Sequence, residues 1–212
     1  MEGEKPHKVR VWSSSNVRAL LRAGDTGGAM AVLGHPHVVE GTVVHGQQRG
    51  RTLGFPTANV GPGEEGMLPA DGVYSGWLVD EGPADSPRTA GKAAQGLTAQ
   101  NVGVGGEDFR APVALHRWAA AISLGTNPTF APSGRTLEAY AITGDPSGWL
   151  DLYGHRVRVE FGPRVADMRA FPSSEALTKQ MGEWVRQCAE AGKAGWTDSL
   201  TGKPNVPELA NR

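Results

Sequence analysis

Residues 41–59 read GTVVHGQQRGRTLGFPTAN, a valine-rich run that passes into a series of glycines. Glycine lets a backbone approach an anion closely, and the basic side chains between the glycines offset negative charge. Thr57 and Asn59 follow across a proline-stiffened turn and offer neutral oxygens to a hard cation such as Mg²⁺. No Lys-Ser/Thr pair follows the second glycine, so the stretch is not a GxxxxGK[ST] phosphate loop. The pattern predicts a phosphate and cation site; the alternative is a Gly/Pro-rich turn with two polar caps.

The residues on either side of this stretch have the pattern of β-strands. Valines flank Gly41, and apolar residues alternate within 73–79 and again within 157–161. We therefore expect the strands to lie within 37–79 and 117–161. Short β-rich runs separated by turn signals predict a small antiparallel barrel or sandwich, and 30 glycines and 15 prolines suit such a loop-rich, mainly β protein.

The stretch 41–59 resembles the nucleotide-binding signature of the bacterial riboflavin kinase family, roughly G-x-V-x-x-G-x-x-x-G-R-x-L-G-F-P-T-A-N, at every fixed position. Three further segments resemble the same family in the same order: 68–76, 121–140 and 151–161. The resemblance covers roughly residues 33–190. It implies a six-stranded antiparallel Greek-key barrel with a C-terminal helix and an active site at one mouth of the barrel.

The resemblance also implies an activity, the phosphorylation of riboflavin at its ribityl 5′-hydroxyl with MgATP, which gives FMN and ADP. An alcohol needs a nearby carboxylate to take its proton during phosphoryl transfer. Glu138 is the matching residue, between Leu137 and Ala139 in a predicted strand. The alternative for Glu138 is an exposed strand glutamate.

The other expected site residues come from the same match. Thr57 and Asn59 would ligate Mg²⁺. The residues expected to contact the nucleotide or the flavin are Gly46, Gly50, Arg51, Gly54, Pro56, Thr57, Asn59, Asn127 and Arg169. For His45 the pattern leaves open nucleotide contact or a hydrogen-bonding loop role, and Asn127 and Thr129 either contact substrate or hold their turn.

The sequence departs from the family pattern at one position. Ala166 stands where an arginine is common in the family, and Arg164 and Arg169 are the candidates to replace it. This departure bears on flavin or product affinity more than on phosphoryl transfer. It leaves a second hypothesis, a flavin- or nucleotide-binding paralogue that acts as a sensor or sequestering protein. The presence of Glu138 argues against that hypothesis, because binding alone needs no base.

Residues 1–35 are expected to form a separate N-terminal piece with two short helices within 13–33. The first would be capped by a serine of 13–15 and the second by Asp25 or Thr26. This piece resembles the last turns of the adenylyltransferase module of bifunctional FAD synthetases. The sequence has no His-x-Gly-His pair, so we expect no FAD synthesis. The alternative is a helical hairpin that packs on the barrel.

The kinase domain is expected to span residues 36–192. Within it, 81–116 is linker-like and predicts a flexible insertion, with a substrate-gating lid as the alternative. Residues 173–190 predict a helix, capped by Ser173 or Ser174, with one apolar face that includes Trp184 and Cys188 as core residues. Residues 193–212 predict a flexible tail.

Composition excludes several classes of protein. The net charge is −1 and no basic stripe is interleaved with aromatic residues, which disfavours nucleic-acid binding. No apolar run approaches the roughly 20 residues of a membrane span. A single cysteine excludes an internal disulfide and a cysteine-based zinc site. We expect a cytoplasmic protein, monomeric, whose partners are riboflavin/FMN and ATP/ADP.

Overall fold

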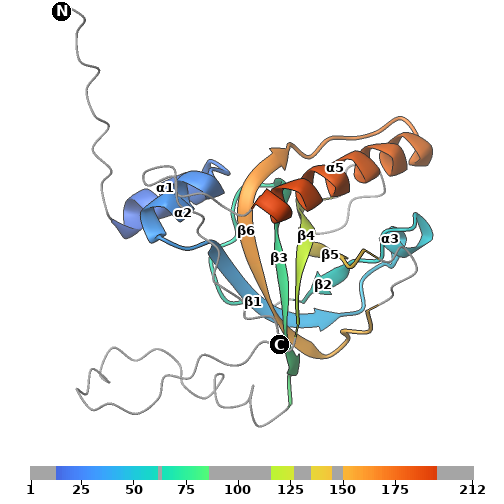
Figure 1. Ribbon diagram of the computed structural model, residues 1–212, viewed down its shortest axis with the longest axis horizontal. Helices are drawn as coiled ribbons and strands as arrows, with labels where there is room; N and C mark the ends of the chain where they lie inside the picture. Colours follow the sequence, from blue (N-terminus) through green and yellow to red (C-terminus); the bar gives the residue numbers. More distant parts are fainter. Residues whose placement is uncertain (1–12, 62–63, 86–115, 127–134, 145–149, 195–212) are drawn as a thin grey trace, which may run out of the picture.

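The computed structural model describes residues 13–61, 64–85, 116–126, 135–144 and 150–194 of the protein (Figure 1). In chain order, its elements are α1 (Ser14–Arg22), α2 (Thr26–Leu33), β1 (His37–Val44), α3 (Arg49–Thr52), β2 (Ala58–Val60), β3 (Gly72–Pro83), β4 (His116–Gly125), β5 (Thr136–Ile142), β6 (His155–Ala166) and α5 (Ser174–Ala194). The two short N-terminal helices and the C-terminal helix predicted from the sequence are confirmed.

The strands close into an antiparallel barrel in the order β1-β2-β5-β4-β3-β6. Each of these strands therefore has two neighbours, and the barrel leaves no long unpaired edge. Neighbours such as β2 and β5, or β3 and β6, are far apart in the chain, which is the connectivity of a Greek key. The predicted six-stranded antiparallel Greek-key barrel is confirmed.

Alternation along each strand separates an inner from an outer set of side chains. On β5, Leu137 and Ala139 are buried within the main core, together with Ile122 and Leu124 of β4. Because successive side chains on a strand point to opposite faces, Glu138 projects from the outer wall of the barrel. The hydrophobic pattern of β5 therefore determines which way this carboxylate faces.

Strand β3 is buried along nearly its whole length, on both of its faces. Its inner side chains, such as Tyr74 and Leu78, belong to the barrel core. On the outer face, Trp77 forms a small apolar cluster with Met30 of α2, which Ala119 and Ala191 extend. The strand continues through residues 81–83, which the sequence placed in the flexible insertion; that boundary was wrong by three residues. The expectation for residues 86–115 lies outside the described part of the chain.

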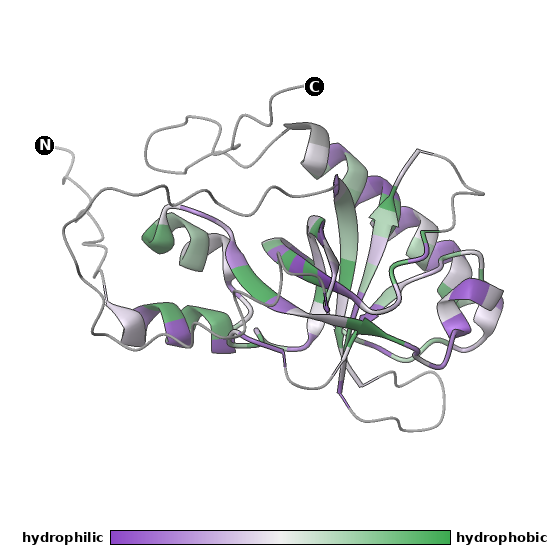
Figure 2. Ribbon diagram, turned by 90° about the horizontal axis from the view of Figure 1, so that it is seen from below, coloured by the Kyte–Doolittle hydropathy of each residue, from purple (hydrophilic) through white to green (hydrophobic). Residues whose placement is uncertain are grey.

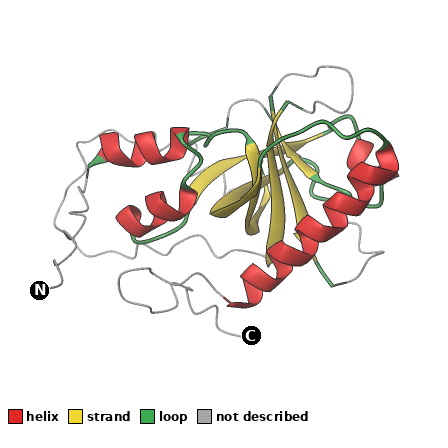
Figure 3. Cartoon of the chain, turned by 90° about the horizontal axis from the view of Figure 1, so that it is seen from above, coloured by secondary structure: helices red, strands yellow, loops and turns green. Residues whose placement is uncertain are grey.

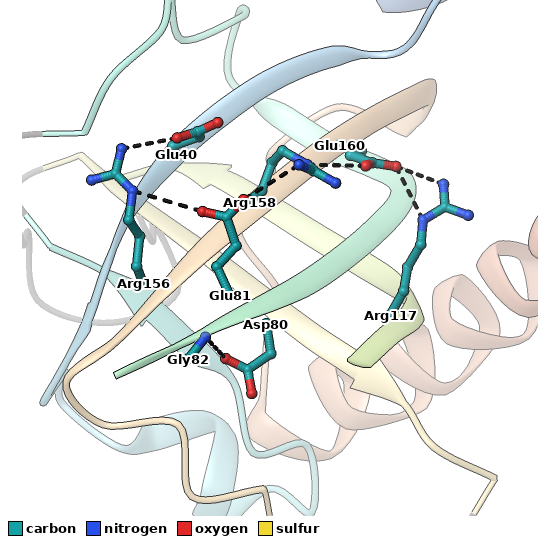
Figure 4. Close-up of polar contacts among 8 residues, drawn as sticks. All are labelled: Glu40, Asp80, Glu81, Gly82, Arg117, Arg156, Arg158 and Glu160. Carbon is teal, nitrogen blue, oxygen red and sulfur yellow. Dashed lines mark hydrogen bonds and ion pairs between the residues drawn. The ribbon is translucent and has the colours of Figure 1, made fainter. Parts of the chain in front are cut away.

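A chain of ion pairs crosses the outer wall where the C-terminal end of β3 pairs with the first residues of β6. Figure 4 shows its members, which alternate in charge: Glu40, Arg156, Glu81, Arg158, Glu160 and Arg117. Glu81 lies in the middle with a side chain that is only 2% exposed, 3.3 Å from Arg158 and 3.7 Å from Arg156. These partners explain why charged residues that read as linker-like are part of a buried strand.

The N-terminal helices are capped and tied to the barrel. The Ser13 hydroxyl accepts from the backbone N–H of Asn16 (3.1 Å), and the Asp25 carboxylate accepts from that of Gly28 (2.7 Å). Asp25 rather than Thr26 is therefore the cap of α2. The buried Thr26 hydroxyl instead donates to the carbonyl of Gly162 in β6 (2.5 Å), so α2 packs directly on the barrel.

Helix α5 crosses the outer wall of the barrel, away from α1 and α2 over most of its length (Figures 1 and 3). Ser173 caps it by accepting from the backbone N–H of Ala176 (3.2 Å). Hydrophilic and hydrophobic residues alternate along this helix (Figure 2), as expected when one face packs against protein. None of the helices in the described ranges combines the length and apolar character needed to cross a membrane.

Candidate functional site

A cavity of about 190 Å³ lies between α5, α3 and the outer wall formed by β2, β5 and β4. Its lining comes from the loop after β1, α3, four strands (β2, β3, β4 and β5), the segment after β6 and α5. The main contributors are Gly46, Gln47, Gln48, Arg49, Gly50, Phe55, Thr57, Asn59, Ser123, Thr136, Glu138, Tyr140, Met168, Arg169, Phe171, Met181 and Trp184. The resemblance implied a site at a barrel mouth, whereas this cavity lies on the outer wall.

Strand register places three polar side chains in one row across this wall. Asn59 of β2 is paired with Glu138 of β5, and Glu138 is in turn paired with Ser123 of β4. Paired residues share a face of the sheet, so all three point into the cavity that they line. Asn59 and Glu138 were predicted from sequence; Ser123 was not, because its place in the row depends on how β4 pairs.

Two hydroxyl groups hold the Glu138 carboxylate, one at each oxygen. Thr57 donates to Oε2 at 3.0 Å, and Thr136 donates to Oε1 at 3.3 Å. Glu138 and its two partners are all partly buried. In the sequence, Glu138 as a predicted base and Thr57 as a predicted metal ligand lie in separate segments, and the structure joins their side chains by a hydrogen bond.

The side chain of Asn59 has room because residue 46 is glycine. A Cβ at Gly46 would lie 2.3 Å from Asn59 Oδ1, far inside contact distance. The Asn59 amide nitrogen donates to the carbonyl of Thr57 at 3.4 Å. Gly46 therefore contributes space for the asparagine oxygen, in addition to any contact that its own backbone makes.

The oxygens of Thr57 and Asn59 fit a magnesium ion. Mg²⁺ prefers oxygen ligands, keeps several waters and is held by few protein groups plus substrate phosphates. The described residues contain no group of three or more His, Cys, Asp or Glu that could form an all-protein metal site. Thr57 and Asn59 both line the cavity, and their hydroxyl and amide oxygens are donors of the kind that such a cation takes.

Two of the predicted glycines, Gly50 and Gly54, lie where a larger residue would not fit or would be strained. A Cβ at Gly50 would lie 2.4 Å from the carbonyl oxygen of Phe55, whose own N–H donates to the Gly50 carbonyl (2.8 Å). Gly54 has φ +84°, a left-handed conformation that favours glycine. Gly46 and Gly50 line the cavity, whereas Gly54 does not and serves to turn the chain.

The remaining predicted residues fall in different places. Arg51 does not line the cavity, although its neighbour Arg49 does. Pro56 lines a smaller second cavity beside it. His45 stacks on Tyr153, with ring centroids 3.7 Å apart, and is not among the residues that line the main cavity. Asn127 and Thr129 lie outside the described residues.

Of the two arginines near Ala166, one reaches the cavity. Arg169 lines it, donates to the side chain of Gln180 (2.8 Å) and lies 4.9 Å over the Phe171 ring. Arg164 is engaged elsewhere: it donates to the carbonyl of Asp71 and forms an ion pair with Asp167 (2.8 Å). Arg169 is therefore the better placed of the two candidate replacements.

The half of the cavity next to α5 is apolar, and the contribution of α5 to it was not predicted from the sequence. It is lined by Met168, Phe171, Leu177, Met181, Trp184 and Val185. Trp184 was expected in the core, but it is half-buried and meets Phe171 edge to face at 5.8 Å. The apolar face of this helix was visible in the sequence; the part of that face that would line a cavity was not.

Cys188 is a core residue, as predicted. It is 1% exposed, and burial raises the pKa of its thiol to about 12. A thiol that stays protonated is a poor nucleophile. Cys188 is also not among the residues that line the cavity.

Comparison with known proteins agrees with this geometry. The family model for riboflavin kinase matches residues 33–191. The chain is 30% identical over 173 residues to the bifunctional riboflavin kinase/FMN adenylyltransferase of Escherichia coli (strain K12), which is 82% of this chain and 43% of that protein. It is 29% identical over 172 residues to the protein of the same name from Bacillus subtilis (strain 168), again with 43% of the relative covered.

The chain thus spans less than half the length of these curated relatives. Among solved structures, it is similar to a macrolide-efflux protein from Streptococcus pneumoniae, with a TM-score of 0.60 and 26% identity over 88% of this chain and 48% of that one. The family match covers the whole barrel and most of α5, including every described residue that lines the cavity. The chain belongs to the riboflavin kinase family.

Proposed function

We propose that the protein transfers the γ-phosphoryl group of ATP to the ribityl 5′-hydroxyl of riboflavin, producing FMN and ADP. The observation that carries this proposal is the position of the Glu138 side chain and its hydrogen bonds. Its carboxylate faces a cavity, is held by two hydroxyl groups, and stands beside Asn59 and Thr57 at the polar end. A carboxylate placed in this way suits a general base next to a phosphate site.

In the proposed reaction, the 5′-hydroxyl oxygen attacks the γ-phosphorus of ATP. The new phosphorus–oxygen bond forms as the bond to the bridging β,γ oxygen breaks, and ADP leaves with that electron pair. The proton of the hydroxyl passes to Glu138. Since phosphoryl transfer depends chiefly on positioning and on charge stabilisation, the fixed orientation of this carboxylate matters as much as its basicity.

Thr57 and Asn59 would hold the magnesium ion that accompanies ATP, and this ion supplies positive charge to the phosphate oxygens. The Thr57 hydroxyl donates a hydrogen bond to Glu138, so its oxygen lone pairs remain for a cation. Gly46, Gly50 and Arg49 line the same end of the cavity, where backbone N–H groups and positive charge suit phosphates.

The apolar end suits the isoalloxazine ring of the flavin. Flat aromatic ligands bind in slots of apolar and aromatic side chains with a few polar groups that fix orientation. Phe171, Trp184 and Met181 line such a slot, and Arg169 stands among them as a polar group. With a polar end that suits phosphates and an apolar end that suits a ring, the two substrates meet near Glu138.

The test is FMN formation by the purified protein from riboflavin and MgATP, with Glu138→Gln as the variant. Loss of a positioned base is expected to lower kcat by about 10²–10⁴-fold. The matched control is Glu183→Gln on the exposed side of α5, which should retain wild-type turnover. Wild-type protein that binds riboflavin and MgATP but makes no FMN would overturn the proposal in favour of a binding protein.

A further inference from the structure

Thr136 is a residue of the cavity that sequence reasoning did not select. It opens β5, and its hydroxyl lies 3.3 Å from Glu138 Oε1 and 3.4 Å from the carbonyl oxygen of Gly125. A hydroxyl has one proton, so it can donate to only one of these acceptors at a time. Thr136 therefore stands between a carboxylate and a backbone carbonyl.

The position of the hydroxyl is determined by the strands around it. Thr136 and Glu138 are two residues apart on β5, so their side chains leave the same face of the barrel wall. Thr136 is also the direct partner of Gly125, the last residue of β4. A β-branched side chain has little freedom at χ1, so the hydroxyl has few alternative positions once the backbone is set.

The two threonines that hold Glu138 differ in what else they do. Thr57 is the proposed cation ligand, and a change there alters the metal and the base together. Thr136 has no place in the proposed cation site, and its two acceptors are Glu138 and Gly125. Among the described residues, its hydroxyl is thus linked to the proposed base and to the end of β4, and not to the proposed cation ligands.

We propose that Thr136 is a positioning residue for Glu138. Its hydroxyl holds Oε1 while Thr57 holds Oε2, which fixes the plane of the carboxylate so that a lone pair faces the substrate alcohol. When Glu138 takes the proton and becomes a weaker acceptor, the Thr136 hydroxyl turns to the Gly125 carbonyl. This assignment rests on the proposed kinase activity.

The experiment compares Thr136→Val with Thr136→Ser. Valine has nearly the same shape as threonine and suits a strand, so it removes the hydroxyl with little other change. We expect Thr136→Val to lower kcat about 10–100-fold, the cost of a poorly placed catalytic group, with KM for both substrates nearly unchanged. Thr136→Ser should restore most of the rate, because it restores the hydroxyl. Thr178→Val on α5, which loses a hydroxyl bonded within the helix, is the matched control with wild-type turnover.

A double-mutant cycle separates positioning from a merely structural role. If Thr136 acts through Glu138, then Thr136→Val should have little further effect in a Glu138→Gln background. An equal loss in both backgrounds, a rise in KM in place of a fall in kcat, or failure of serine to restore the rate would each overturn the assignment. Failure of the kinase activity itself is recognised separately, as absence of FMN with the wild-type protein, and it would remove the role of Thr136 as well.

Discussion

The hydroxyl of Thr57 donates a hydrogen bond to the carboxylate of Glu138 across 3.0 Å, although 81 residues separate them in the chain. The contact follows from the pairing of β2 with β5, which places Asn59 opposite Glu138 and leaves Thr57 just before the strand begins. This hydrogen bond links the proposed base to the proposed cation ligands. A substitution of Thr57 is therefore expected to alter the position of the Glu138 carboxylate, and a substitution of Glu138 to alter the position of the Thr57 hydroxyl.

Gly46→Ala should disrupt the cation site without unfolding the barrel. The new Cβ would lie 2.3 Å from Asn59 Oδ1, so the asparagine must move away from its place beside Thr57. We expect the affinity for MgADP to fall by at least about tenfold, as for loss of one hydrogen bond to a charged group. Isothermal titration calorimetry with MgADP measures this.

The control for that experiment is Gly182→Ala on α5, where an added Cβ meets no atom within 4 Å. Alanine in a helix interior is favoured over glycine by about 1 kcal/mol, so this variant should be slightly more stable and bind MgADP normally. Unchanged MgADP affinity in Gly46→Ala would mean that Asn59 is not a cation ligand.

Arg169→Ala and Arg164→Ala should have different effects. Arg169 lines the cavity, so its removal is expected to raise KM for riboflavin by roughly tenfold, which corresponds to about 1.4 kcal/mol of binding. Arg164 bonds to the Asp71 carbonyl away from the cavity, so its removal should lower thermal stability and leave KM unchanged. Steady-state kinetics and thermal unfolding on the same pair of proteins check this, and a larger KM effect at Arg164 would reverse the assignment.

Glu81→Ala should destabilise the barrel without changing its chemistry. The side chain is 2% exposed between Arg156 and Arg158, and its removal leaves two partly buried guanidinium groups without this partner. Breaking a buried ion pair from one side typically costs about 3–5 kcal/mol of unfolding free energy. Urea denaturation measures the loss, while kcat at low temperature should stay near the wild-type value.

The comparison variant is Glu65→Ala. Glu65 forms an ion pair with the same Arg156 at 3.4 Å, but its side chain is 67% exposed. Exposed ion pairs contribute about 0–1 kcal/mol to the free energy of unfolding, so Glu65→Ala should change that free energy very little in the same denaturation experiment. Equal effects of the two changes would show that burial does not govern this network.

Cys188 should be unreactive in the native protein. Burial raises the pKa of its thiol to about 12, so the reactive thiolate is scarce at pH 8 and remains scarce well above it. A thiol-specific disulfide reagent at pH 8 should label no cysteine in the folded protein and one in urea, because Cys188 is the single cysteine of the chain. Rapid labelling of the native protein would mean that α5 opens away from the barrel.

Local patterns predicted much of the fold. Alternating apolar residues marked β1, β3 and β6, serine and aspartate marked the starts of the N-terminal helices, and the apolar stripe marked α5. Local pattern failed at the end of β3. Glu81 reads as a linker residue, and only its arginine partners on β6 make it a buried strand residue.

The residues of the candidate site also fall into two groups, those predicted from a local motif and those placed by tertiary contacts. Thr57, Asn59 and Glu138, which line the cavity, were selected from the sequence because each lies in a short motif. Ser123, Thr136 and Trp184 were not selected, since their places in the cavity lining depend on which strand pairs with which and on where α5 crosses the wall. No spacing within a single segment carries that information.

The sequence by itself determined the family, the barrel and the residue types of the polar site, because these depend on local backbone preference, alternation and motif order. The tertiary structure alone decided that the cavity lies on the outer wall, that Arg169 rather than Arg164 enters it, and that Thr57 and Thr136 each hold one oxygen of Glu138. The physical reason is that strand register and helix packing bring together groups that are far apart in the chain, such as Thr57 and Glu138, which are 81 residues apart, and these contacts form only when the barrel closes.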